Sequence, residues 1–270
     1  MFARFKISIE TVEKLLKEKY LLVESPVAAT ESQVSKQVTK LFSPSTGILN
    51  GDALQDDFFP TGQDKPYNVF ICHSSRDRDV VEKFAGMLNQ YFKVRCFVDS
   101  MVWKRIDDLQ KIVDTNLPIS ITGEYEYDDI LQSSAHVHSL LSIALFKMID
   151  QCECCIFVGS KESLNLNFNN IQNETLSSWI YQEIYYMNHT IPTEPDWLKK
   201  VRMYSATEAQ ALYESAIKIS HGIDLSHFRP LGINHFTYRY YTDGDEFLRN
   251  LYFETGVTNG KIIDKYGKIR

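Results

Sequence analysis

The sequence predicts an α/β protein built around a parallel β-sheet, and two observations lead to this prediction. From residue 67 onward, short apolar runs alternate with segments in which apolar residues recur at helical spacing. Two of the runs, residues 67 to 73 and 154 to 158, are apolar on both faces, which is typical of interior strands covered by helices on both sides. We therefore expect these two runs to be central strands of one sheet.

The other elements follow from periodicity and from signals at helix ends. We expect helices over residues 9 to 22, 79 to 92, 106 to 115, 136 to 151, 177 to 188 and 246 to 253, and further strands over 94 to 98 and from 216 to 220 or 225. Asp79 and Glu82 match a capping box at the start of one helix, and Asp245 is placed to cap the last one.

The first 66 residues differ in composition from the rest of the chain. Four prolines between residues 26 and 66, with many Ser, Thr, Gly and Asp, indicate loops after a single short helix. We therefore expect residues 1 to 66 to form a small helical and looped N-terminal extension outside the sheet, and residues 67 to 270 to form the main domain.

Composition argues against several classes of partner and location. The net charge is -6, and no stripe of lysine or arginine is interleaved with aromatic residues, so we expect no nucleic-acid partner. The longest apolar stretch, residues 140 to 149, contains Ser142 and Lys147 and is shorter than the roughly 20 residues of a membrane-spanning helix. The first 20 residues lack the pattern of a secretory signal. We therefore expect no membrane segment and a cytoplasmic location.

The five cysteines are an odd number, and three of them lie in or beside predicted strands, so we expect reduced, buried thiols. Cys152 and Cys155 form a single C-x-x-C that has no second pair and enters a strand. His136 and His138 are two residues apart on a predicted helix and point to different faces. These patterns predict no metal site.

Candidate ligand-binding residues follow the predicted strands, because ligands of open parallel sheets bind beyond the carboxyl ends of the strands. The residues selected by this rule, or by their place on the next helix, are Ser74, Ser75, Arg76, Asp99, Trp103, Trp179 and Glu183. Arginine suits phosphate, aromatic rings suit a base and a carboxylate suits ribose hydroxyls, so the set suits a nucleotide. Ile180, Ile184 and Met187 form a stripe beside Glu183, so we expect Glu183 to lie off the packing face.

Each of these candidates also has a structural alternative. Glu183 could be a solvated helix position, Trp179 could belong to the core, and Arg76 and Asp99 could serve only in turns. A Ser-His-Asp hydrolase built on His73 lacks a nucleophile elbow. A dehydrogenase or an NTPase has little support, because the chain has no G-x-G-x-x-G and no P-loop.

Four segments, YNVFICHSSRDRDVVEKFAGML, VRCFVDSMVW, CCIFVGS and SSWIYQEI, resemble in order the strand, loop and helix boxes of a TIR (Toll/interleukin-1 receptor) domain. The resemblance covers about residues 67 to 225 and implies a flavodoxin-like parallel sheet flanked by helices. Its W-x-x-x-E box falls where NAD-consuming bacterial members keep their catalytic glutamate, which implies that Glu183 is catalytic. Residues 100 to 108 would correspond to a loop that helps to close a neighbouring subunit's site, although they lack the glycine or proline common there.

The function that this resemblance implies is cleavage of NAD+, as an NAD+ nucleosidase or ADP-ribosyl cyclase in bacterial anti-phage defence or signalling. NAD+ would be the substrate, and no separate cofactor is expected. The expected partners are other copies of the TIR surface and a sensor or effector protein. The alternative is a non-catalytic TIR module that recruits partners through its loops.

Overall fold

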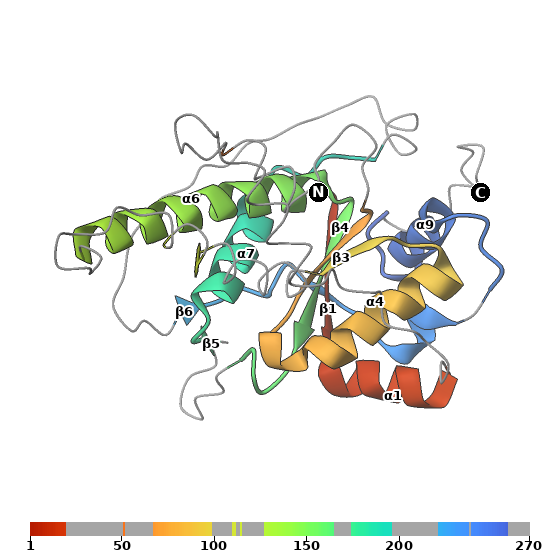
Figure 1. The fold of residues 1–270 in the computed structure, drawn as a ribbon. Coiled ribbons are helices and arrows are strands. Elements are labelled where there is room, and N and C mark those ends of the chain that lie inside the picture. Colours follow the sequence, from red (N-terminus) through yellow and green to blue (C-terminus); the bar gives the residue numbers. More distant parts are fainter. Residues whose placement is uncertain are drawn as a thin grey trace. The chain divides into compact units, whose positions relative to one another are not determined.

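The structure, a computed structural model, describes residues 1–19, 51, 67–98, 110, 111, 114, 127–164, 174–195, 221–237 and 239–258. Its main feature is a five-stranded sheet with the order β3-β2-β4-β1-β7, in which every pair of neighbouring strands is parallel (Figure 1). The strands are β1 (Ala3–Ser8), β2 (Val69–Cys72), β3 (Cys96–Val98), β4 (Cys154–Gly159) and β7 (Arg229–Pro230). The predicted α/β fold with a flavodoxin-like parallel sheet is confirmed.

Helices alternate with these strands along the chain. They are α1 (Ile9–Lys19), η1 (Ser75–Asp77), α4 (Arg78–Phe92), α6 (Tyr127–Gln151), α7 (Ser178–His189), η2 (Ile233–Phe236) and α9 (Gly244–Glu254). A small antiparallel sheet pairs β5 (Glu174–Thr175) with β6 (His221–Gly222). The predicted helices agree with α1, α4, α7 and α9 to within a few residues, and α6 begins earlier than expected. The helix predicted over 106 to 115 and the strand predicted over 216 to 220 fall largely or wholly outside the described residues.

The chain divides into two compact units, and the boundary differs from the expected one. One unit comprises residues 1–26, 67–99 and 149–270 and contains the whole parallel sheet. The other comprises residues 27–66 and 100–148 and contains most of α6. Within this second unit, Gln110 Nε2 donates to Asp114 Oδ1 (2.7 Å) and to Ser133 Oγ of α6 (3.1 Å).

The strand β1 overturns the prediction that residues 1 to 66 lie outside the sheet. It pairs with β4 over its full length, from Ala3 opposite Cys154 to Ser8 opposite Gly159, and it pairs with β7 on its other side. Phe5 is completely buried. The alternation of Ala3, Phe5 and Ile7 with Arg, Lys and Ser is typical of a half-buried strand, and the prediction failed because it assigned the whole loop-rich segment before residue 67 to one extension. The prediction of an external extension is therefore wrong for residues 3 to 19.

The two faces of the sheet carry different helices, as the alternating side chains of β1 show. Phe5 stacks on Tyr252 of α9, with ring centroids 6.0 Å apart, and α9 in turn meets α4 through Phe247 and Phe92 at 4.6 Å. Arg4 points to the opposite face, where its guanidinium donates to backbone carbonyl oxygens at the end of α7. Thus α4 and α9 cover one face and α7 covers the other (Figure 1).

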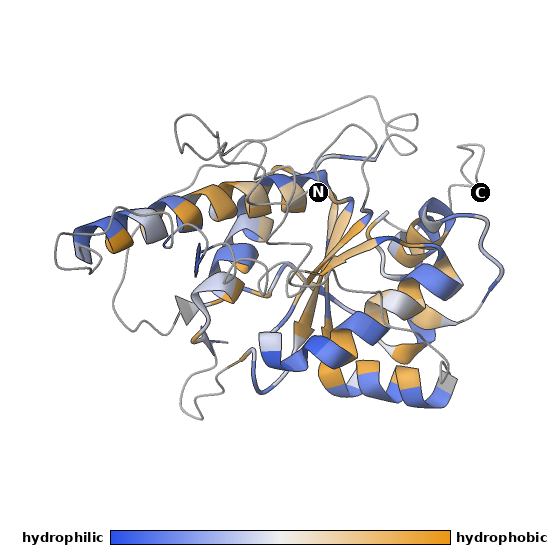
Figure 2. Ribbon diagram, in the orientation of Figure 1, coloured by the Kyte–Doolittle hydropathy of each residue, from blue (hydrophilic) through white to orange (hydrophobic). Residues whose placement is uncertain are grey.

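The core follows the hydropathy of the chain. All of β2, and all of β4 except its last residue, are buried, as expected for strands covered on both faces. Figure 2 colours these central strands mostly hydrophobic, whereas α1, α4 and α9 carry both hydrophobic and hydrophilic residues. On the inner face of α1, Val12 and Leu15 have no exposed surface. The short helices are therefore held mainly by burial of one apolar face.

Two predicted helix starts are corrected. The residue before α4 is Asp77, which makes no side-chain capping bond, and Glu82 instead accepts a hydrogen bond from Arg78 Nε (2.6 Å). The helix α9 begins after Asp243, whose Oδ1 accepts from the backbone N of Glu246 (2.8 Å), so Asp245 is not the cap. Its first residue, Gly244, must be small, because a Cβ there would lie 2.6 Å from the backbone oxygen of Lys93, the residue that follows α4.

Candidate ligand-binding site

The carboxyl edge between β2 and β4 is the place where this fold favours a ligand. The two strands are neighbours, and both end at the same edge because they are parallel. The helix after β2 is α4, on one face, and the next helix after β4 is α7, on the other. Ligands of open α/β sheets bind where successive connections leave to opposite faces, because the diverging loops open a crevice there.

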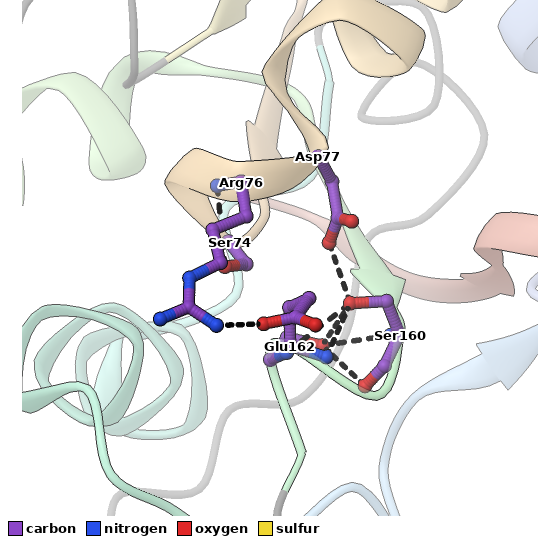
Figure 3. Close-up of polar contacts among 6 residues, drawn as sticks. Ser74, Arg76, Asp77, Ser160 and Glu162 are labelled. Atoms are coloured by element: carbon purple, nitrogen blue, oxygen red, sulfur yellow. Dashed lines mark hydrogen bonds and ion pairs between the residues drawn. The ribbon is translucent and has the colours of Figure 1, made fainter.

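A group of six polar residues from the two loops lies at this edge, and we call it the edge cluster. Its members are Ser74, Arg76, Asp77, Ser160, Glu162 and Ser163. Figure 3 shows the side chains of Arg76 and Asp77 reaching from the loop after β2 towards Glu162 and Ser160 in the loop after β4. Arg76 Nη1 lies 2.5 Å from Glu162 Oε2, and Ser160 Oγ donates to Asp77 Oδ2 at 2.5 Å.

The loop after β4 is shaped by two serines. Ser160 Oγ accepts hydrogen bonds from the backbone N of Glu162 and of Ser163, both at 3.1 Å. Ser163 Oγ returns the interaction by accepting from the backbone N of Ser160 at 2.8 Å. Serine side chains that bind nearby backbone groups fix tight turns. This turn presents Glu162 to Arg76.

The ion pair of the edge cluster is accessible and weak. The Arg76 side chain is 78% exposed and that of Glu162 is 42% exposed. Pairs this exposed contribute roughly 0.2–1 kcal/mol, because water and salt screen them. Arg76 can therefore exchange Glu162 for a stronger anion such as a phosphate oxygen, to which a guanidinium donates two parallel hydrogen bonds.

The structure brings together only part of the predicted nucleotide set. Ser74 is buried and caps η1 by accepting from the backbone N of Arg76 at 3.4 Å, whereas Ser75 is exposed. Asp99 and Trp103 lie outside the described residues. Glu162 was not among the predicted residues, since its link to Arg76 joins positions 86 apart in the sequence. An acidic residue just after a strand end was the one available signal.

Glu183 lies inside the protein, which overturns the prediction that it stands off the packing face of its helix. Its side chain is 0% exposed, and it shares the buried face of α7 with Ile180, Ile184 and Met187. At about 100° per residue, position 183 is only about 40° from position 187 around the helix axis, so both belong to one broad arc. Trp179 lies one turn earlier and is half-buried.

Both ends of α7 are fixed by side chains. At its start, Ser177 Oγ accepts from the backbone N of Ile180 (3.2 Å). At its end, Thr190 Oγ1 donates to the carbonyl oxygen of Tyr186 (2.6 Å), and Arg4 of β1 donates to the carbonyl oxygens of Met187 and Thr190. These bonds satisfy helix-end groups that have no partner within the helix.

The pKa of the Cys155 thiol on β4 is affected by the charges of both Arg4 and Glu183. Burial raises the pKa of Cys155 well above its usual value, and the neighbouring Cys152 raises it further. The Arg4 guanidinium lowers this pKa and the Glu183 carboxylate raises it, so both charges act on the same buried sulfur. Arg4 and Cys155 are register partners on adjacent strands. The thiol therefore stays protonated at neutral pH and is a poor nucleophile.

No metal centre is found in the part of the chain that the structure describes, since no group of three or more His, Cys, Asp or Glu side chains there is placed to hold an ion. All five cysteines are free thiols. Burial raises the pKa of the Cys152 and Cys154 thiols.

Comparison with protein-family models, with curated proteins and with solved structures finds no match for this chain. The resemblance of its four segments to a TIR domain therefore stays a prediction. Among the described helices, none is long and apolar enough to cross a membrane.

Proposed function

We propose that the protein is a TIR-like enzyme that cleaves the nicotinamide–ribose bond of NAD+, with Glu183 as the catalytic carboxylate. The observation that supports this most is the place of Glu183, buried on the helix that follows β4 among Ile180, Ile184 and Met187. A carboxylate costs more to bury than a leucine or methionine of similar size. Buried ion pairs can often be replaced by apolar side chains without loss of stability, so packing alone does not require a glutamate here.

The reaction asks for little beyond such a carboxylate. The bond between ribose C1′ and the pyridinium nitrogen breaks, its electron pair returns to the ring, and neutral nicotinamide leaves. The sugar then carries a positive charge, which Glu183 would stabilise while binding the ribose hydroxyls. Water adds at C1′ and loses a proton to give ADP-ribose, or a nucleophile of the same molecule attacks to give a cyclic product.

The edge cluster would bind the other end of the substrate. Arg76 is exposed and paired only weakly, so it can take a phosphate oxygen, and Ser74 and Ser75 directly precede it in the chain. Trp179, half-buried on α7, would be a stacking group of the proposed NAD+ site, whereas the further candidates Asp99 and Trp103 lie outside the described residues. The buried carboxylate and the accessible arginine would thus act on opposite ends of one dinucleotide.

The proposal also covers how the protein assembles and where in the cell it acts. Residues 100 to 108 would complete the site of a neighbouring copy, so that activity depends on self-association. The setting would be the cytoplasm of a bacterium, in anti-phage defence or signalling, with a sensor or effector protein as a further partner.

A second candidate function is a non-catalytic interaction module. The observation that favours it is the complete burial of Glu183, because a catalytic carboxylate must reach its substrate. The enzyme reading requires that assembly or substrate binding open a path to this side chain. The module reading requires no such opening.

The experiment that tests the proposal is incubation of the full-length protein with NAD+, followed by separation of nicotinamide, ADP-ribose and cyclic products. We expect nicotinamide release, with a specific activity that rises with protein concentration because the site needs a second copy. Absence of any product over the whole concentration range would favour the interaction module. A specific activity independent of concentration would contradict the shared site but not the reaction.

A further inference from the structure

Arg4 is the residue through which the N-terminal strand contacts the helix that carries Glu183. It is the second residue of β1 and half-buried, in a strand that lies between β4 and β7. Its guanidinium donates through Nε to the carbonyl oxygen of Met187 and through Nη2 to that of Thr190 at 3.3 Å. The first contact joins residues that are 183 positions apart in the sequence, and the second joins residues that are 186 positions apart. The N-terminal strand therefore fixes the end of a distant helix.

The same contacts tie the guanidinium to the helical turn that follows Glu183. Met187 is four residues beyond Glu183, so the two lie on one face of α7, separated by one helical turn of about 6 Å. Arg4 projects from the sheet face that α7 covers, beside its register partner Cys155. The Cys155 thiol is within electrostatic range of both Arg4 and Glu183. Arg4 and Glu183 therefore both lie where α7 packs on the strands β1 and β4, and we call this region the buried layer.

We propose that Arg4 is the positioning residue for Glu183, because it fixes the C-terminal end of α7, one helical turn beyond Glu183, against β1. Its role in catalysis rests on the proposed function, whereas its coupling to Glu183 does not. Arg4 touches no reacting atom in this scheme.

Arginine suits this position better than lysine for two reasons. Its planar, forked guanidinium can donate to two carbonyl oxygens at once, and its charge lies at the negative end of the α7 dipole. Burial lowers the pKa of Arg4, and the neighbouring Cys155 opposes that shift. A lysine would keep the charge but would bind the two carbonyl oxygens less rigidly.

A double-mutant cycle in protein stability tests the coupling without any enzyme assay. The full-length wild type, Arg4→Met, Glu183→Met and the double variant are unfolded in urea, with Glu183→Gln as a second background. We expect Arg4→Met to lower the urea midpoint more when Glu183 is present than when it is replaced, because a buried carboxylate depends on fixed surroundings more than an apolar side chain does. Equal shifts in both backgrounds would overturn the proposal and reduce Arg4 to a helix cap.

Kinetics test the catalytic side, with Ser177→Ala as the matched control. Ser177 caps the opposite end of α7, and its loss weakens the same helix without removing a charge near Glu183. We expect Arg4→Met to lower kcat by about 10- to 100-fold at nearly constant KM, because a displaced carboxylate acts poorly in the transition state. Arg4→Lys should recover part of this loss, and Ser177→Ala should leave kcat unchanged well below its Tm.

The stability cycle and the kinetic comparison together distinguish the ways in which the proposal could be wrong. Equal losses of kcat in Arg4→Met and Ser177→Ala would show that α7 is merely destabilised, which contradicts a positioning role. A wild type that releases no nicotinamide would defeat the proposed function, while the double-mutant cycle would still decide whether Arg4 and Glu183 are coupled.

Discussion

The edge cluster and the buried layer beneath α7 both hold an arginine and a glutamate, but they hold them in opposite ways. At the edge, Arg76 and Glu162 form a direct ion pair whose side chains are 78% and 42% exposed. In the buried layer, Arg4 binds backbone carbonyl oxygens while Glu183 is 0% exposed. The edge pair can open at little cost and accept a ligand. The buried layer is fixed by the fold, so its charges are costly to disturb.

The largest expected effect concerns the dependence of the buried layer on β1. Deletion of residues 1 to 19 removes the strand between β4 and β7, so β4 loses its neighbour on that side and β7 loses its link to the sheet. We expect the truncated chain to lose cooperative unfolding, because buried backbone groups and the core surface of β4 would be exposed. Circular dichroism during heating measures this. A cooperative transition close to that of the full chain would show that β1 is dispensable.

A single substitution in β1 measures how much this strand contributes to stability. Phe5 is completely buried and stacks on Tyr252, so Phe5→Ala should lower the free energy of unfolding by about 3–5 kcal/mol. Tyr240→Ala is the control, because this aromatic side chain is 84% exposed and its loss should change stability by less than about 0.5 kcal/mol. Urea denaturation of both variants gives the comparison. A loss below about 1 kcal/mol for Phe5→Ala would place β1 outside the cooperative core.

The buried thiols of β4 and the buried phenol of Tyr252 should make the protein sensitive to alkali. Burial raises the pKa of the Cys154 and Cys155 thiols and of the Tyr252 phenol, so the native state keeps protons that the unfolded state loses. Stability should therefore be constant below the unfolded thiol pKa of about 8.5 and fall above it, by up to about 1.4 kcal/mol per pH unit for each thiol. Urea midpoints from pH 7.5 to 10 measure the fall. Cys155→Ala should reduce the slope, and an unchanged slope would exclude this thiol as a source.

The smallest expected effect belongs to the edge cluster. Glu162→Gln removes the charge that faces Arg76, and we expect it to lower the free energy of unfolding by less than about 1 kcal/mol, because both side chains are largely hydrated. The difference between wild type and variant should shrink in high salt. A loss of several kcal/mol, or one independent of salt, would show that the edge is as rigid as the buried layer.

The parts of the fold that the sequence predicted well are those with long, regular patterns. β4 and β2 are continuous apolar runs, and α4 and α7 have apolar residues at helical spacing, so their type and approximate bounds were predictable. β7 has only two residues and gave no pattern, whereas β1 has the alternation of a half-buried strand but is separated from the next strand by a loop-rich segment of sequence. Strands this short are defined by neighbours distant in the sequence.

The sequence analysis named Ser74 and Arg76 of the edge cluster, but it did not predict which residues they contact. The prediction for Glu183 treated the packing face of α7 as a narrow stripe, whereas the helix is covered over a broad arc that includes position 183. Glu162 was missed because it contacts Arg76, which is 86 positions away in the sequence. Arg4 was missed because it contacts Met187, which is 183 positions away. Periodicity carries no information about such contacts.

The most direct test of the central claim compares the two glutamates in one assay. Glu183→Gln and Glu162→Gln each remove one carboxylate charge with little change in shape, and nicotinamide release from NAD+ is measured for both and for the wild type. We predict that Glu183→Gln loses at least about 100-fold in kcat, because its charge stabilises the transition state, whereas Glu162→Gln retains kcat and changes mainly KM. Near wild-type turnover by Glu183→Gln would contradict the catalytic assignment.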